Sequence, residues 1–288
     1  MTHPTIQSFL DDLARQGKSP VTIRGYRADL EAFAAWVQQT YGEPFEPARI
    51  VREDVRAWRA HLLAVQRCKP ATVNRRLAAL RAFCRWAVAE GMLGADPTAG
   101  VPTVPQAPTP PRALESSDLR RLVRRAQAGG NPLHIAVVVL LANTGLRVSE
   151  LCGLRLSDVE VTERRGRVVV RRGKGEKYRE VPLNGEARRA VLEYLAVRPK
   201  VADDRLLIGR RGPLTESGVW RIVAKYAREA GVEATPHVLR HTFATRLLRE
   251  AGADLVVVSD LLGHSDPRTT ARYVRSSAAD REEAVERL

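Results

Sequence analysis

The spacing of hydrophobic residues along the first hundred positions is typical of helices. Leu30, Phe33 and Val37 lie three or four residues apart, so they share one face of a helix. Similar runs recur further along, and Gly91 is a stop signal after the last of them. Helices are expected at residues 21–38, 54–65 and 71–90. The pattern therefore predicts a helical domain over residues 1–100.

A proline-rich stretch follows this domain. Residues 99–111 read AGVPTVPQAPTPP. Proline fixes the backbone and removes a hydrogen-bond donor, so this stretch is extended and cannot form a helix. We expect a semi-rigid linker over residues 101–113 and a second domain over residues 114–288.

The hydrophobic pattern of the second domain again predicts helices, with one β-hairpin among them. Helices are expected at residues 119–126, 132–143, 149–154, 184–197 and 217–230. The segments 167–171 and 178–181 are β-like, and the glycine-flanked turn between them carries Lys174. The predicted fold class is therefore mainly α with a small β-hairpin or sheet.

The stretch 235–273 contains three short predicted helices with clear start and stop signals. Thr235 precedes a proline and caps the first helix, and Gly252 and Gly263 stop the first and second. The helices are expected at residues 236–250 and 255–262 and from residue 267 onward.

Helix starts and ends in this stretch carry two imidazoles, a guanidinium and a phenol. These are His237, Arg240, His264 and Tyr273. His237 and Arg240 are three residues apart, so both are expected on one side of the first helical turn. His237 and His241 have a spacing that can hold a metal, but no third ligand follows and Arg240 would oppose a cation. We therefore expect a phosphodiester site with no metal and no cofactor.

The charge of the chain supports a nucleic-acid partner. The 288 residues hold 47 Lys+Arg against 33 Asp+Glu, a net charge of +14, and both predicted domains are basic. The helix expected at 71–90 presents arginines opposite its apolar face. A charge run of this kind is either a solvated face or a phosphate contact. The candidate DNA-binding residues are Arg75, Arg76, Arg81 and Arg85.

Other composition features exclude several protein classes. No apolar run approaches the roughly 20 residues of a membrane-spanning helix, and the N-terminus lacks a signal-peptide profile. The three cysteines show no CxxC spacing, which favours a reducing compartment. We expect a cytoplasmic, nucleoid-associated protein with no membrane partner.

Several motifs, in order, resemble the catalytic boxes of the tyrosine recombinase (phage integrase) family. They are TGLRVSEL, the GKG turn, HVLRHTFAT, LLGHSD and a tyrosine nine residues after the last histidine. SPVTIRGYRADLEAFAAWV and ATVNRRLAALRAFCRWAVAEG are similar to the N-terminal core-binding domain of the family. With no arm-binding domain expected ahead of residue 5, the chain looks most like Xer-type members, while short integrases and transposon recombinases remain open.

The resemblance implies a SAM-like core-binding domain, a tyrosine recombinase catalytic domain and a 3′-phosphotyrosine intermediate in double-stranded DNA. By resemblance Tyr273 is the nucleophile. If a Tyr273→Phe variant still formed the covalent adduct, Tyr226 would be next in line. The assisting residues implied are Arg147, Lys174, His237, Arg240 and His264.

The resemblance also implies a DNA-bound tetramer. Its subunits exchange C-terminal tails, with a paralogous recombinase as a further partner. Chromosome dimer resolution and element integration or excision are the roles implied. The alternatives are type IB topoisomerase-like relaxation of DNA and a DNA-binding relative without catalysis.

Overall fold

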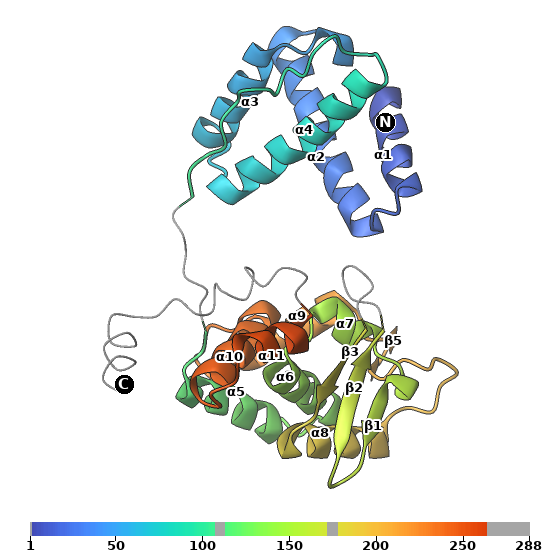
Figure 1. Cartoon of the computed structure of the whole chain (residues 1–288), viewed down its shortest axis with the longest axis vertical. Coiled ribbons are helices and arrows are strands. Elements are labelled where there is room, and N and C mark those ends of the chain that lie inside the picture. Colours follow the sequence, from blue (N-terminus) through green and yellow to red (C-terminus); the bar gives the residue numbers. More distant parts are fainter. Residues whose placement is uncertain (1, 107–112, 172–177, 264–288) are drawn as a thin grey trace. The chain divides into compact units, whose positions relative to one another are not determined.

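The computed structural model describes residues 2–106, 113–171 and 178–263, and it divides into two compact units, Met1–Pro108 and Thr109–Leu288 (Figure 1). Each unit has its own hydrophobic core. Lys174, His264, Tyr273 and the helix expected from residue 267 lie outside the described residues.

The described part of the first unit is helical, as its hydrophobic spacing predicts. Its elements are α1 (Pro4–Arg15), α2 (Pro20–Tyr41), a 3₁₀ turn (Pro47–Arg49), α3 (Arg52–Ala64) and α4 (Pro70–Ala89). Helices α1, α2 and α4 begin with a proline, which suits the first helical turn because its missing N–H would have no partner there. The predicted helices form within a few residues of their expected ends, and α1 is an additional one.

Aromatic rings dominate the core of this unit. The ring of Phe33 lies 5.9 Å from Trp36 and 5.8 Å from Trp58, centroid to centroid. Phe9 of α1 meets Phe83 of α4 at 5.6 Å. Phe9, Phe33, Trp58 and Phe83 are at most 2% exposed, so the helices enclose a packed interior.

The first residues of the predicted linker pack on the first unit. Val101 is 4% exposed and belongs to its core. Asn74 on α4 donates to the carbonyl of Val104 at 2.9 Å and accepts from its N–H at 2.8 Å. Residues 101–106 form no helix, in agreement with the proline content, but the chain leaves the first unit only after Val104.

The second unit combines helices with a small antiparallel sheet. The helices are α5 (Ser116–Ala128), α6 (Pro132–Thr144), α7 (Val148–Gly153), α8 (Gly185–Val197), α9 (Glu216–Glu229), α10 (Pro236–Arg249) and α11 (Leu255–Leu262). The strands are β1 (Val159–Val161), β2 (Gly166–Val170), β3 (Arg179–Pro182), β4 (Ile208–Gly209) and β5 (Gly212–Pro213), with a 3₁₀ turn at Leu156–Asp158.

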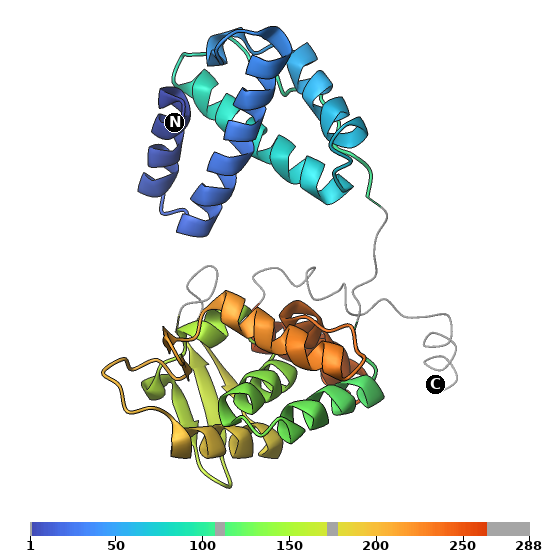
Figure 2. The ribbon, with the colours of Figure 1, turned by 180° about the vertical axis from the view of Figure 1, so that it is seen from behind.

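The hairpin β2–β3 has the expected antiparallel pairing, with Val168 opposite Val181, and β1 adds a third strand in the order β1-β2-β3. The strands β1, β4 and β5 were not expected from the sequence. The three-stranded sheet lies at one side of the unit and α5 and α10 at the other, as both views show (Figures 1 and 2).

Helix α6 is the centre of the second unit. Its residues from Ala136 to Thr144 are all buried, because α5, α8, α9 and α10 surround it. Gly145 ends the helix with a φ of +61°. A Cβ at this position would lie 2.4 Å from the Phe243 ring and 2.8 Å from Leu262, so glycine also allows α10 and α11 to approach the turn.

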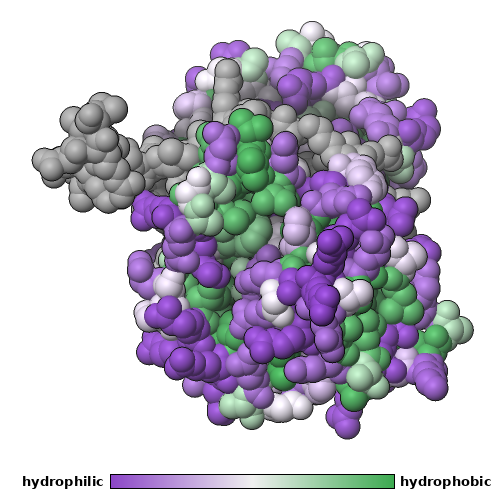
Figure 3. All heavy atoms as spheres, turned by 60° about the horizontal axis from the view of Figure 1, so that its bottom comes forward, coloured by the Kyte–Doolittle hydropathy of each residue, from purple (hydrophilic) through white to green (hydrophobic). Residues whose placement is uncertain are grey.

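Hydrophilic residues cover most of the molecular face in Figure 3, and hydrophobic residues gather in smaller patches there. Among the residues that the structure describes, no helix is both long and apolar enough to cross a membrane.

Candidate active site

Arg147 lies at the turn between α6 and α7. Gly145 stops α6, and Arg147 is the residue before the first turn of α7. Its backbone N–H donates to Glu150 Oε2 at 2.8 Å, and its Nη1 donates to Glu150 Oε1 at 2.7 Å. The side chain of Arg147 is 29% exposed. Glu150 therefore fixes both the backbone and the guanidinium of this arginine, while part of the side chain still faces solvent.

Arg240 reaches the same place from α10. Thr235 caps that helix as predicted, and its hydroxyl accepts from the Val238 N–H. Arg240 is 5% exposed and donates to the carbonyls of Gly145 and Leu262. Its Nη1 lies 4.0 Å from Glu150 Oε2. The fold thus brings together Arg147 and Arg240, two predicted site residues that are far apart in the sequence.

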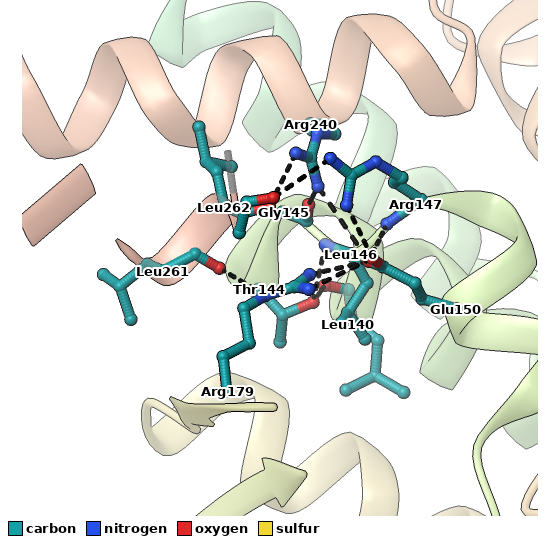
Figure 4. Close-up of polar contacts among 11 residues, drawn as sticks. Leu140, Thr144, Gly145, Leu146, Arg147, Glu150, Arg179, Arg240, Leu261 and Leu262 are labelled. Carbon is teal, nitrogen blue, oxygen red and sulfur yellow. Dashed lines mark hydrogen bonds and ion pairs between the residues drawn. The ribbon is translucent and has the colours of Figure 1, made fainter. Parts of the chain in front are cut away.

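A third arginine, Arg179 at the start of β3, completes the cluster and was not predicted. Its Nη2 and Nη1 donate to the two carboxylate oxygens of Glu150 at 2.6 and 3.1 Å. Its Nε donates to the carbonyl of Leu261 at 2.9 Å. Figure 4 shows the guanidinium groups of Arg147, Arg179 and Arg240 around the Glu150 carboxylate.

The electrostatics of the cluster keep Glu150 ionised. Burial opposes its charge, but hydrogen bonds from Arg179 and from the Arg147 backbone outweigh that effect and lower its pKa below the ordinary value. One carboxylate then faces three guanidinium groups. The cluster keeps an excess of positive charge, which suits an anionic ligand such as a phosphodiester.

The two histidines of α10 occupy different environments. His237 is exposed and His241 is 5% exposed, with ring centroids 6.2 Å apart. His237 and Arg240 therefore do not share one exposed side, because Arg240 turns into the protein. Burial, with a smaller effect of His237, lowers the pKa of His241 to about 4, so this ring is neutral at physiological pH. In the described residues no group of three possible ligands can hold a metal.

The candidate DNA-binding arginines on α4 differ in their contacts. Arg75 is exposed and forms an ion pair with Asp29 on α2. Arg76 donates to Gln66 at 2.8 Å, and Arg81 donates to the carbonyl of Val101. Arg85 is exposed. The structure thus places Arg75 and Arg85 at the surface, whereas Arg76 and Arg81 are half-buried.

Tyr226 is unsuited to be a nucleophile. It is 1% exposed inside the core, and its hydroxyl lies 3.0 Å from His134 Nδ1. Glycine at position 129 packs against its ring, where a Cβ would come within 2.8 Å. A duplex cannot reach this hydroxyl.

Comparison with known proteins identifies the family. Residues 112–280 match the phage integrase family, and residues 6–91 match its N-terminal SAM-like domain. Because the first match alone spans more than half of the chain, the chain belongs to the phage integrase family. Its similarity extends specifically to Xer-like tyrosine recombinases.

Named relatives include a tyrosine recombinase XerC of Neisseria meningitidis, 35% identical over an alignment of 277 residues that covers 93% of this chain and 89% of the relative. A tyrosine recombinase XerD of Listeria monocytogenes is 36% identical over 282 residues, covering 93% of this chain and 92% of the relative.

Solved structures show the same fold. The crystal structure of XerA recombinase aligns with a TM-score of 0.55 at 28% identity, covering 100% of this chain and 98% of the other. XerH bound to a palindromic difH substrate in a post-cleavage complex aligns with a TM-score of 0.76 at 21% identity, covering 96% and 83%. The mainly α fold class with an N-terminal SAM-like domain is therefore confirmed.

Proposed function

We propose that this chain is a site-specific DNA recombinase that cleaves and rejoins strands through a 3′-phosphotyrosine on Tyr273. The observation that carries the proposal is the meeting of Arg147 and Arg240 around Glu150, at the end of the helix that precedes His264. Planar guanidinium groups bind two non-bridging phosphate oxygens in a bidentate manner. Residues from distant parts of the chain thus form one phosphate site.

The reaction follows from the residue types. The Tyr273 oxygen attacks phosphorus, the bond from phosphorus to the 5′ oxygen breaks, and that oxygen leaves with a proton. A tyrosine has a pKa of about 10, so it needs nearby cations and a base to react near pH 7. The intermediate retains the phosphodiester energy, so a 5′ hydroxyl of another strand can attack it and release the tyrosine without ATP.

The other site residues have complementary roles in this proposal. Lys174, which lies between β2 and β3 in the sequence, gives the proton to the 5′ leaving oxygen. His237, exposed on the first turn of α10, orients the site or accepts the tyrosine proton. His264 donates a hydrogen bond to the phosphate.

Double-stranded DNA is the proposed partner of both units. The net charge of +14 supports it. On the first unit, Arg75 and Arg85 are exposed on α4 and contact phosphates, with Arg76 and Arg81 beside them. The similar XerH structure is a complex with its difH substrate.

On DNA we propose a tetramer in which each C-terminal tail docks on a neighbouring subunit, with a second, paralogous recombinase as a further member. The role proposed is Xer-like, in chromosome dimer resolution or in element integration and excision, in the cytoplasm at the nucleoid. Truncation after Ser277 is expected to leave half-site binding intact and to abolish recombination. Normal recombination by the truncated protein would exclude the exchange.

A covalent-trapping experiment tests the function. Suicide substrates made from candidate sites of the host genome are expected to trap wild-type protein covalently on DNA. The Tyr273→Phe variant is expected to bind the same DNA without forming the covalent adduct. Trapping is expected to survive EDTA. A Tyr273→Phe variant that still forms the adduct, or a strict magnesium requirement, would refute the mechanism. General relaxation of a supercoiled plasmid without a target site would indicate a topoisomerase. The absence of a covalent adduct on every site tested would indicate a DNA-binding protein without catalysis.

A further inference from the structure

The C-terminal end of α11 receives hydrogen bonds from three different arginines (Figure 4). Carbonyl groups at a helix C-terminus have no partner within the helix and carry partial negative charge. The three pairs are Arg179 Nε with Leu261 O at 2.9 Å, Arg240 Nη2 with Leu262 O at 2.8 Å and Arg147 Nη2 with Gly263 O at 3.3 Å. Three consecutive carbonyl groups are thus fixed by cations from three other elements.

Arg179 differs from the other two in that both of its terminal nitrogens donate to the Glu150 carboxylate. Its side chain is 7% exposed, and its donors point to Glu150 and to Leu261. A Cβ at Gly263 would lie 2.7 Å from its Nη1, so backbone covers it closely. The charge of Arg179 is therefore already paired with the Glu150 carboxylate. The Arg147 side chain is 29% exposed, and Arg240, although as buried as Arg179, donates to backbone carbonyls and lies 4.0 Å from that carboxylate.

The contacts of Arg179 nevertheless determine where the phosphate-binding arginines lie. It engages both oxygens of Glu150, the carboxylate that also fixes Arg147. Arg240 remains 4.0 Å from the same carboxylate. Without Arg179, a buried carboxylate would lose two charge-assisted hydrogen bonds and would attract Arg240 into full contact. The end of α11 would lose one of its anchors at the same time.

We propose that Arg179 is a positioning residue for strand cleavage, which holds Glu150 and the end of α11 so that Arg147 and Arg240 keep their phosphate-binding geometry. This inference rests on the proposed function. A displacement of about 1 Å in a reacting group can lower a rate about 100-fold. The loss is therefore expected in cleavage and not in DNA affinity.

The test compares Arg179→Gln and Arg179→Lys with Arg167→Gln. Arg167 lies on the adjacent strand β2, with its guanidinium 2.7 Å from Glu160 and 2.8 Å from Glu180 at the surface. Single-turnover adduct formation is measured at saturating DNA, on a normal suicide substrate and on one with a bridging sulfur at the 5′ position. Half-site binding and circular dichroism melting are measured in parallel.

Arg179→Gln is expected to bind a half-site within threefold of wild type and to form the adduct about 100-fold more slowly on both substrates. Arg179→Lys is expected to stay at least about 10-fold slow, because one ammonium cannot reproduce the two-sided fork of a guanidinium. Arg167→Gln is expected to react within twofold of wild type.

Three results would overturn the inference. The first is adduct formation by Arg179→Gln at the wild-type rate, which would not contradict the proposed function because wild type is active. The second is recovery on the bridging-sulfur substrate, which would assign Arg179 to leaving-group protonation instead. The third is loss of folding or of DNA binding in both Arg179 variants, which would make the residue purely structural. A wild type that forms no adduct would refute the proposed function itself.

Discussion

Replacing Glu150 with glutamine tests whether the arginine cluster depends on one buried carboxylate. The side chain of Glu150 is 2% exposed, and those of Arg179 and Arg240 are 7% and 6% exposed. Removing one partner of a buried ion pair typically costs about 3–5 kcal/mol, since the remaining charge is left without compensation. Glutamine keeps the shape and one acceptor oxygen, so we expect the lower end, about 3 kcal/mol. A domain of ordinary stability, about 5–15 kcal/mol, would remain folded.

The measurement is urea unfolding at neutral pH with two probes. Trp36, Trp58 and Trp86 lie in the first unit, so tryptophan fluorescence reports mainly on that unit. Circular dichroism reports on helices of both units. Glu150→Gln is expected to shift the dichroism transition of the second unit and to leave the fluorescence transition unchanged. The matched control is Glu180→Gln, since Glu180 pairs with Arg167 at the surface, with an expected loss below about 1 kcal/mol.

The pH dependence of this effect has a definite sign. Because the pKa of Glu150 is lowered in the folded protein, its stabilising contribution is fully present above its ordinary pKa of 4.5. The contribution is lost as the pH falls through the lowered value. The difference in free energy of unfolding between wild type and Glu150→Gln is therefore expected to become smaller only at acidic pH. A difference below about 1 kcal/mol at neutral pH, equal to that of the control, would refute the reasoning.

Three further predictions follow from other parts of the chain. The pKa of His241 falls to about 4 in the folded protein, so unfolding takes up a proton below about pH 6.5. Between pH 7.5 and 5 the free energy of unfolding of wild type, measured in urea, is therefore expected to fall by about 2 kcal/mol more than that of His241→Gln. Gly145→Ala is expected to cost about 1–3 kcal/mol more than Gly130→Ala by thermal unfolding, because both glycines have positive φ but only the Cβ at 145 would meet side chains. DNA affinity is expected to fall roughly 10³-fold or more between 50 and 200 mM salt if six or more phosphates are contacted, and a flat profile would exclude that footprint.

The sequence predicts most helices because their signals are local. The apolar run of α6 and the threonine-proline start of α10 each lie within a few residues of the element that they define. Strands β1, β4 and β5 have only two or three residues each, too few for an alternating pattern. Their pairing depends on partners elsewhere in the chain, so hydrophobic spacing alone does not predict them.

In the candidate site, too, some residues can be identified from local sequence and others only from the folded structure. Arg147 and Arg240 occur in motifs that a resemblance can identify, and the fold brings them together. Glu150 also lies in such a motif, three residues after Arg147, but that spacing alone is equally typical of an ordinary helix start. Its role emerges only when Arg179 and Arg240 approach from other elements.

Arg179 does leave a signal in the sequence, in the alternation of β3. Residues of a strand point alternately to opposite faces, so Arg179 must share the face of Val181, which is buried in the core. A charged side chain at an inward position of a strand requires a buried partner of opposite charge, because an isolated buried charge is very costly. The sequence does not show which carboxylate is the partner of Arg179. In the structure that partner is Glu150, on α7.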